Sequence, residues 1–207
     1  MEIFDFLLHL DKYLAEIINQ FGIFTYIILF LIIFVETGLI VMPFLPGDSL
    51  LFVVGTFAAN GLFNIWTVYF LLLFAAILGD AVNYSIGYNI GPKIFSRDDS
   101  RFFNKEHLEK TKVFYEKYGG KTIILARFLP IIRTFAPFVA GIGKMDYKVF
   151  FFYNIIGGFA WVTSLTFAGY FFGGLPIIKN NFETAILVII FISLIPVIVE
   201  YFKSKRK

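Results

Sequence analysis

The sequence contains no cysteine, which removes several kinds of chemistry at once. Disulfide scaffolds, thiolate catalysis and iron–sulfur clusters all depend on cysteine sulfur. Histidine is nearly as scarce, with two residues in the whole chain, and no H-E-x-x-H pattern is present. A zinc site built only from protein side chains is therefore not expected, and we predict a protein without a metal or other cofactor.

Charged residues are also scarce, at 16% of the 207 residues, whereas hydrophobic residues make up 58%. Soluble domains usually contain about 25% charged residues. A soluble domain of this length has too little interior to bury so much apolar surface, which includes 29 phenylalanines. The net charge of +3 is too small to indicate nucleic-acid binding. The composition predicts an all-α integral membrane protein, which we expect in the inner (cytoplasmic) membrane as a multi-pass chain.

Long apolar stretches mark the expected membrane-spanning helices. Charge-free runs at 62–79, 149–178 and 184–199 can each supply one, because a span needs about 20 mostly apolar residues. Residues 21–43 are long enough as well, although one acid interrupts them. Residues 1–20 lack the basic start and the cleavage site of a signal peptide. Apolar side chains recur there at helical spacing, which predicts an amphipathic helix in the membrane interface.

Basic residues gather in two places, at 92–121 and at 202–207. Short basic segments stay on the cytoplasmic side of a membrane, so both are expected on that side, with an even number of crossings between them. The runs at 149–178 and 184–199 supply two crossings. The intervening segment 121–143, which arginines and prolines interrupt, is therefore expected to enter the membrane and return to the same side.

A similar pattern occurs in the first half of the chain, where prolines also interrupt residues 36–59. We expect a second re-entrant hairpin there, entering from the opposite side, so that the two halves form an inverted repeat of the kind found in transporters. The single membrane domain, residues 1–207, then divides into an interfacial helix 1–20, a first half 21–91, a cytoplasmic amphipathic segment 92–120, a second half 121–175, a last spanning helix 182–201 and a basic tail 202–207.

Four charged residues interrupt these apolar, proline-broken segments: Glu36, Asp48, Arg127 and Arg133. Each would cost roughly 2.5–3.5 kcal/mol at the centre of a bilayer, so they must be paired or hydrated. One hypothesis is structural, in which two acids and two bases pin the hairpins together. The other is functional: the arginines bind a phosphate through their forked N–H groups, and the acids take up protons, gate the site and couple proton movement to transport.

Other residues are predicted to support this site. Prolines and a glycine break the arms of the hairpins and free backbone groups that can hold an anion. Polar and aromatic residues follow at helical spacing on the spanning helices, where close helix packing is the alternative explanation. These supporting residues are Pro46, Gly47, Asp80, Tyr84, Pro130, Asn154 and Trp161.

Motifs of hydrolytic enzymes are incomplete in this chain. Residues 47–50 spell G-D-S-L, but no histidine stands in the sequence block that this hydrolase motif requires. No G-x-S-x-G nucleophile elbow is present either. We therefore predict that the protein is not an enzyme.

The order and spacing of these residues resemble the DedA family, also called the VTT or SNARE-associated membrane proteins. The resemblance rests on R-F-L-P-I-I-R-T at 127–134, on P-x-x-P-G-D-S-L at 43–50 and on G-D at 79–80, and it extends over about residues 30–170. It implies two facing re-entrant hairpins and a role in moving lipids between leaflets. Bacterial members of that family are linked to recycling of undecaprenyl phosphate, to envelope integrity and to growth that depends on the proton motive force. The family relies on the acids and arginines that match Glu36, Asp48, Arg127 and Arg133.

Taken together, these features lead us to expect a flippase-like or scramblase-like transporter of undecaprenyl phosphate or another phospholipid, with protons as the candidate coupling ion. The expected partners are membrane lipids with a phosphorylated headgroup, and no nucleic acid. Two alternatives stay open. A proton-coupled exporter of a small solute or drug would need a closed aqueous cavity, and a non-catalytic membrane scaffold would need only the ion pairs.

Overall fold

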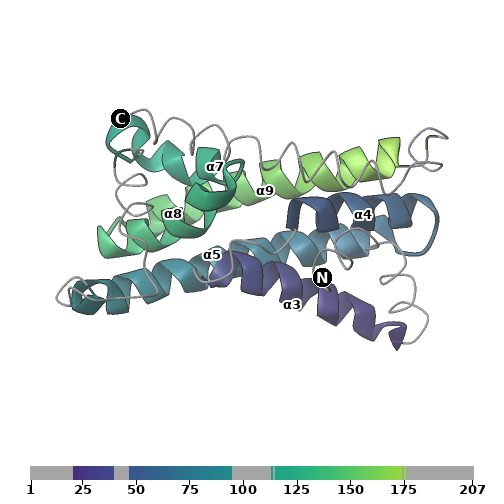
Figure 1. The fold of residues 1–207 in the computed structure, drawn as a ribbon, viewed down its shortest axis with the longest axis horizontal. Coiled ribbons are helices and arrows are strands. Elements are labelled where there is room, and N and C mark those ends of the chain that lie inside the picture. Colours follow the sequence, from purple (N-terminus) through teal and green to yellow (C-terminus); the bar gives the residue numbers. More distant parts are fainter. Residues whose placement is uncertain (1–20, 40–46, 95–112, 114, 174, 176–207) are drawn as a thin grey trace, which may run out of the picture. The chain divides into compact units, whose positions relative to one another are not determined.

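The computed structural model describes residues 21–39, 47–94, 113, 115–173 and 175. Every regular element among these residues is a helix, and no strand occurs among them (Figure 1). The predicted all-α class is therefore confirmed. The predicted interfacial helix 1–20, the last spanning helix 182–201, the tail 202–207 and most of the segment 92–120 lie outside the described residues.

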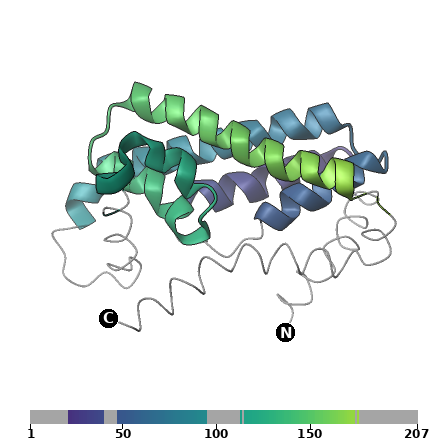
Figure 2. The ribbon, with the colours of Figure 1, turned by 90° about the horizontal axis from the view of Figure 1, so that it is seen from above.

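Two long helices run through the described part of the chain (Figures 1 and 2). Helix α5 spans Ile65–Ile94 and helix α9 spans Tyr147–Phe172. Most of α5 and all of α9 have the length and hydropathy of a membrane span. They cover much of the charge-free runs at 62–79 and 149–178. Helix α5 continues well past its run, because Asp80 is buried and paired inside the protein and does not end the helix.

Shorter helices occupy the described parts of the two segments predicted as hairpins, 36–59 and 121–143. Helix α3 spans Phe24–Gly38 and helix α4 spans Gly47–Ala59, so the segment 36–59 contains the end of α3 and all of α4. Residues 40–46, which connect them, lie outside the described part of the chain. In the second half, the short helix η1 at Gly119–Lys121 leads directly into helix α7 at Thr122–Ala126.

The segment predicted at 121–143 consists of two short helices that contact each other, α7 at Thr122–Ala126 and α8 at Pro130–Ile142. In the turn between them, three successive N–H groups each donate to the carbonyl three residues earlier, which satisfies the backbone there. Leu129 is extended, with φ −123° and ψ 100°, as a residue before proline should be. Pro130 then starts α8, where its missing N–H costs no hydrogen bond.

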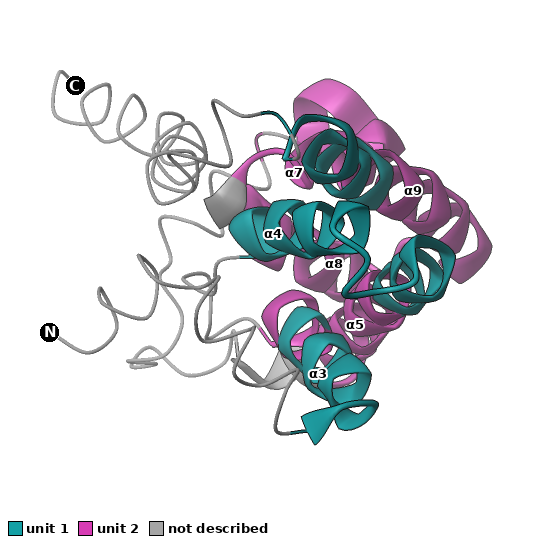
Figure 3. Cartoon of the chain, turned by 90° about the vertical axis from the view of Figure 1, so that its right-hand side faces the viewer, with its two compact units in different colours: residues 1–33, 45–74, 162–207 teal, residues 34–44, 75–161 magenta. Residues whose placement is uncertain are grey.

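The chain divides into two compact units (Figure 3). Unit 1 consists of residues 1–33, 45–74 and 162–207, and unit 2 consists of residues 34–44 and 75–161. Unit 1 therefore contains α4 with the first part of α5 and the last part of α9. Unit 2 contains α7 and α8 with the remaining parts of α5 and α9.

In unit 1, α4 approaches α9 so closely that two positions need glycine. A Cβ atom on Gly55 would overlap the backbone at Thr166 and Tyr170, and a Cβ atom on Gly169 would overlap the backbone of Phe52. Nearly every residue of α4 is buried. A helix that is apolar on all sides requires such burial.

In unit 2, α8 meets α5 in the same way. A Cβ atom on Gly141 would overlap the backbone at Tyr84 and Tyr88, and one on Gly87 would overlap the backbone of Phe138. Both short helices carry the pattern Phe-x-x-Gly at the crossing. The two units thus pack a short buried helix against the later part of a long helix through matching contacts.

Large aromatic side chains cover the outer faces of the two long helices. Those more than half exposed include Trp66, Phe70 and Phe74 on α5 and Phe152, Phe159 and Phe171 on α9. Soluble proteins rarely expose so much contiguous apolar surface, whereas lipid tails accept it. The abundance of phenylalanine in the sequence is therefore explained by surface as well as by core.

Candidate functional site

A cluster of charged side chains is buried inside unit 2. Arg127 lies in the turn between α7 and α8, Arg133 near the start of α8, Glu36 near the end of α3 and Asp80 in the middle of α5. None of these residues is more than 3% exposed. The structure thus brings together three of the four charged residues singled out in the sequence, and it adds Asp80, which the sequence placed only in a supporting role.

Arg133 and Glu36 form the first buried ion pair of the cluster. The guanidinium Nη2 of Arg133 donates to Glu36 Oε1 at 2.5 Å, and the side chains are 3% and 0% exposed. The pair joins α8 to α3. Removing one partner from such a pair leaves a buried charge without compensation, which is strongly destabilising.

Arg127 and Asp80 form the second pair. Arg127 Nη2 donates to Asp80 Oδ2 and to Asn154 Oδ1, each at 2.5 Å, and makes a longer bond of 3.4 Å to the carbonyl of Ala76. The amide of Asn154 is itself oriented, because its Nδ2 donates to the carbonyl of Ile77 at 3.0 Å. Helices α5 and α9 therefore hold the guanidinium of Arg127 from two sides.

Helix α9 provides both the space and an aromatic surface for these guanidinium groups. A Cβ atom on Gly157 would lie 3.2 Å from Arg127 Cδ, and one on Gly158 would lie 3.6 Å from Arg127 Nη2. About one turn later, the ring of Trp161 lies 5.8 Å from Arg127 Cζ and 4.8 Å from Arg133 Cζ. A tryptophan ring attracts cations at such distances. Trp161 therefore connects the two ion pairs.

Asn83 belongs to the same region, although the sequence analysis did not single it out. It is fully buried, and its Nδ2 donates to the carbonyls of Thr37 at 3.0 Å and Thr134 at 2.9 Å. The side chain thus ties α3, α5 and α8 together. Its position three residues after Asp80 on an apolar helix is the signal that would have found it, because residues at that spacing share a helix face.

The cluster retains hydrogen-bonding capacity. Among the described residues, Arg127 Nε, Arg127 Nη1 and Asp80 Oδ1 have no hydrogen-bond partner. Most buried polar groups in proteins are hydrogen-bonded, so such atoms call for an explanation. Two guanidinium nitrogens on a buried arginine can donate to the oxygens of a bound anion.

Tyr84 does not belong to the charge cluster. Its hydroxyl donates to the carbonyl of Met145, and its ring stacks on Phe150 with 4.4 Å between the ring centres. These contacts link α5 to α9 and to the connection that precedes it. The contacts of Tyr84 are those of a packing residue, and its predicted supporting role stays a prediction.

Three other predicted residues lie in the first turns of short helices. Asp48 is in the first turn of α4 in unit 1 and is half-buried, and Gly47 begins that helix. Pro130 begins α8, and Pro46 lies outside the described residues. No group of three or more histidine, aspartate or glutamate side chains within the described ranges is placed to hold a metal ion.

Comparison with known proteins identifies the family of this chain. The VTT domain family matches residues 45–171. The chain is also 54% identical to Protein DedA of Escherichia coli K12 over 205 residues, which cover 98% of this chain and 93% of that protein. The chain belongs to the DedA family.

Two other relatives are less similar to this chain. The chain is 46% identical over 175 residues to an uncharacterized membrane protein of Mycobacterium leprae, covering 84% of this chain and 78% of that protein. It is 34% identical over 152 residues to the inner membrane protein YqjA of Escherichia coli K12, covering 73% of this chain and 69% of that protein. No solved structure matches the chain. The names of these relatives and the two long apolar helices agree with a membrane location.

The VTT domain of this DedA-family protein contains most of the buried cluster. Arg127, Arg133, Asp80 and Asn154 fall within the matched residues 45–171, as does Trp161. Glu36, the partner of Arg133, precedes the matched region. The ion pair between α3 and α8 therefore joins the domain to the helix before it.

Proposed function

We propose that this DedA-family protein is a lipid transporter of the inner membrane, of flippase or scramblase type, that moves undecaprenyl phosphate or another phospholipid between leaflets. It carries out no chemical conversion in this proposal, and it needs no cofactor. The observation that supports it most directly is the buried pair of arginines in unit 2, one of which keeps two nitrogen donors available.

The chemistry of arginine favours phosphate as the recognised group. A guanidinium remains charged at any physiological pH and offers N–H donors in a fixed plane that matches phosphate oxygens. Arg127 and Arg133 lie against the same ring of Trp161, so both positive charges are concentrated in a small volume. One phosphate carried into this volume would meet two guanidinium groups.

The two carboxylates supply the proposed link to protons. In this structure Glu36 and Asp80 neutralise the arginines, so a lipid phosphate has to compete with them. When a carboxylate takes up a proton, its guanidinium becomes available and a phosphate can restore the charge balance. Proton uptake and phosphate binding then favour each other. This proposal adds Asp80 to Glu36 as a coupling acid and leaves Asp48 with a gating role in unit 1.

A multi-pass arrangement with two re-entrant hairpins of opposite orientation fits this function. The matching glycine crossings of α4 with α9 and of α8 with α5 support two equivalent halves. The sequence supports them as well, because F-L-P occurs at 44–46 and 128–130, and F-V-x-G follows at 52–55 and 138–141. Broken helices at membrane depth are stable when surrounding protein buries them, as it does α4 and most of α8.

A non-catalytic membrane scaffold is the second candidate function. It is favoured by the one-to-one pairing of each arginine with a carboxylate, which is what a purely structural ion-pair network requires. Such a network would hold α3, α5, α7 and α8 together and would bind no lipid phosphate.

Leaflet-resolved transport in proteoliposomes separates these functions. Labelled undecaprenyl phosphate is compared with undecaprenol, which has the same tail and no phosphate, in vesicles containing the wild type, Arg127→Lys or Lys148→Arg. We expect the wild type and the Lys148 control to move only the phosphorylated lipid, and Arg127→Lys to fall to the rate of protein-free vesicles, because lysine lacks the planar fork. Equal transport of undecaprenol, or wild-type transport by Arg127→Lys, would refute the proposal. Absence of transport by a stably folded wild type would favour the scaffold.

A further inference from the structure

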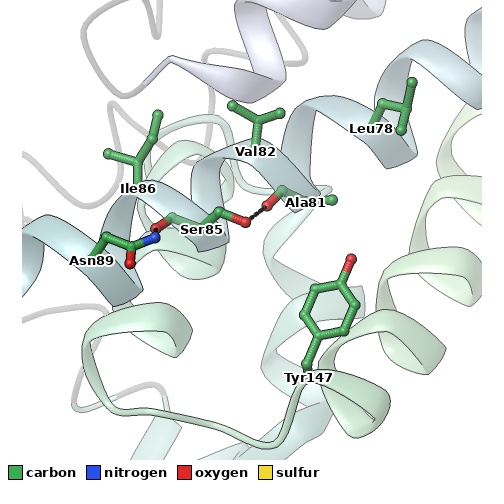
Figure 4. Close-up of a pocket in the computed structure, with 7 residues that line it drawn as sticks. All are labelled: Leu78, Ala81, Val82, Ser85, Ile86, Asn89 and Tyr147. Atoms are coloured by element: carbon green, nitrogen blue, oxygen red, sulfur yellow. Dashed lines mark hydrogen bonds between the residues drawn. The ribbon is translucent and has the colours of Figure 1, made fainter.

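A groove on unit 2 lies apart from the buried charge cluster. Its first part has a volume of about 370 Å³ and is lined along α5 by Leu78, Val82 and Ile86. In Figure 4 these three side chains point away from Tyr147, and Ser85 and Asn89 lie on the side of α5 toward it. Its second part has a volume of about 430 Å³ and contains Lys144. The two parts adjoin, because Ser85, Asn89 and Tyr147 line both.

The two parts of the groove differ in polarity. The apolar side chains of the first part belong to the stretch of α5 that is suited to span a membrane, Ile65–Asn89. The second part lies along the last residues of that stretch, 84–89, and it adds Lys144 and Asp146 from the connection after α8. An occupant that fills both parts must therefore have an apolar chain followed by a polar or charged group.

Two polar residues line the apolar part of the groove, but their side chains already have hydrogen-bond partners. Ser85 Oγ donates to the carbonyl of Ala81 at 2.8 Å, and Asn89 Nδ2 donates to the carbonyl of Ser85 at 2.8 Å (Figure 4). Both groups thus bond within their own helix. They can line an apolar chain without losing these bonds.

Lys144 has a backbone conformation that is unusual for its residue type. Its φ of 51° is in the left-handed region, directly after Gly143, the residue that caps the end of α8. Its N–H donates to the carbonyl of Gly141, and the N–H of Met145 donates to that of Ala140, as in a helix end that normally has glycine at this position. The glycine in this sequence stands one residue earlier, at Gly143. Strain of this kind persists where surrounding structure enforces it and often marks a functional position.

We propose that this groove holds one phospholipid of the surrounding bilayer, with its phosphate at Lys144 and one acyl chain along α5. The tyrosines fit this assignment, because Tyr88 and Tyr147 are about half exposed and tyrosine is enriched at the level of lipid headgroups. The site is separate from the proposed transport function, since neither Arg127 nor Arg133 lines the groove. The bound lipid would stabilise unit 2 without being transported.

Thermal unfolding of the purified full-length protein in detergent tests which kind of molecule the groove binds. The melting temperature is measured with added phosphatidylglycerol, with diacylglycerol of the same chains and with glycerol 3-phosphate. We expect a concentration-dependent rise with phosphatidylglycerol only, because ligands that bind the folded state stabilise it. An equal rise with diacylglycerol would show that the phosphate is not recognised. An equal rise with glycerol 3-phosphate would show a free-phosphate site. Either result would overturn the proposal.

Two variants test whether Lys144 binds the lipid phosphate. Lys144→Gly relieves the strained φ and removes the charge, so we expect a higher melting temperature without lipid and loss of the lipid-dependent rise. Lys148→Ala removes the same charge from the exposed first turn of α9 and should keep the rise. A lipid-dependent rise in Lys144→Gly equal to that of the wild type would refute the assignment. If Lys144→Gly does not fold, native mass spectrometry of Lys144→Glu replaces it, and retention of co-purified phospholipid at the wild-type level would count against the site.

Discussion

Asp80→Asn is the most informative perturbation of the buried cluster, because it changes one charge and almost no volume. Asp80 and Arg127 are each about 1% exposed, and their side chains meet at 2.5 Å. The substitution leaves a positive guanidinium inside unit 2 without its carboxylate. Asn154 and the carbonyl of Ala76 remain as neutral acceptors, so the guanidinium keeps hydrogen bonds but loses its compensating charge.

The expected decrease in the free energy of unfolding follows from the loss of this compensating charge. Removing one partner of a buried ion pair costs about 3–5 kcal/mol. The new amide can still accept one hydrogen bond from Arg127, so we expect a value near the lower end, about 3 kcal/mol. That amounts to roughly a 150-fold change in the folding equilibrium constant. It is a large share of a typical net stability of about 5–15 kcal/mol.

Equilibrium unfolding in detergent, together with abundance in the membrane, measures this effect. Glu116→Gln is the matched control, because it removes the same charge from an exposed position, where substitutions usually change stability by about 0.5 kcal/mol or less. The double variant Asp80→Leu with Arg127→Met should recover much of the loss, since a hydrophobic pair can replace a buried ion pair. If Asp80→Asn is as stable as Glu116→Gln, the ion pair does not stabilise the fold and the reasoning is wrong.

Three further predictions concern the same unit. Trp161→Leu should lower the free energy of unfolding by about 2–4 kcal/mol, because it removes a buried ring and two cation–π contacts, while Trp161→Phe should lose less in the same unfolding assay. Gly141→Val should reduce the yield of folded protein in size-exclusion chromatography, because its side chain would overlap the backbone of α5; a wild-type yield would contradict the close crossing. Glu36→Gln should lose stability as Asp80→Asn does, because it leaves Arg133 without its carboxylate; its folded fraction should bind lipid phosphate but lose the dependence of transport on an imposed pH gradient, and unchanged dependence in proteoliposomes would exclude Glu36 as the coupling acid.

The sequence predicted the long helices well, for a simple physical reason. A stretch without charges that is long enough to cross a bilayer has few stable alternatives to a helix. The runs at 62–79 and 149–178 therefore located α5 and α9. The high cost of buried charge likewise identified Glu36, Arg127 and Arg133 as residues that must find partners.

The sequence did not predict which charges pair. Arg127 and Asp80 are 47 positions apart, and their contact depends on how α5 and the turn after α7 pack together. Asp80 follows a long apolar run, so the sequence alone left open whether it lies deep or near the membrane surface. The structure places it in the middle of a continuous helix, beside the space that Gly157 and Gly158 leave for Arg127.

Other features depend on local geometry that composition does not reveal. Asn83 is one polar residue among several on α5, and only its two carbonyl contacts show that it connects three helices. The left-handed φ of Lys144 is equally hidden, because the preceding Gly143 is the residue that a sequence rule would place at that conformation.

The paired substitution Glu36→Arg with Arg133→Glu tests most directly whether the buried arginines hold a lipid phosphate or only pin helices together. The reversed pair keeps opposite charges between α3 and α8, but it moves the guanidinium away from its position over Trp161. The initial rate of undecaprenyl phosphate transport is measured at equal amounts of folded protein. The account predicts near-normal thermal stability with transport at the rate of protein-free vesicles. Wild-type transport by the reversed pair would contradict it.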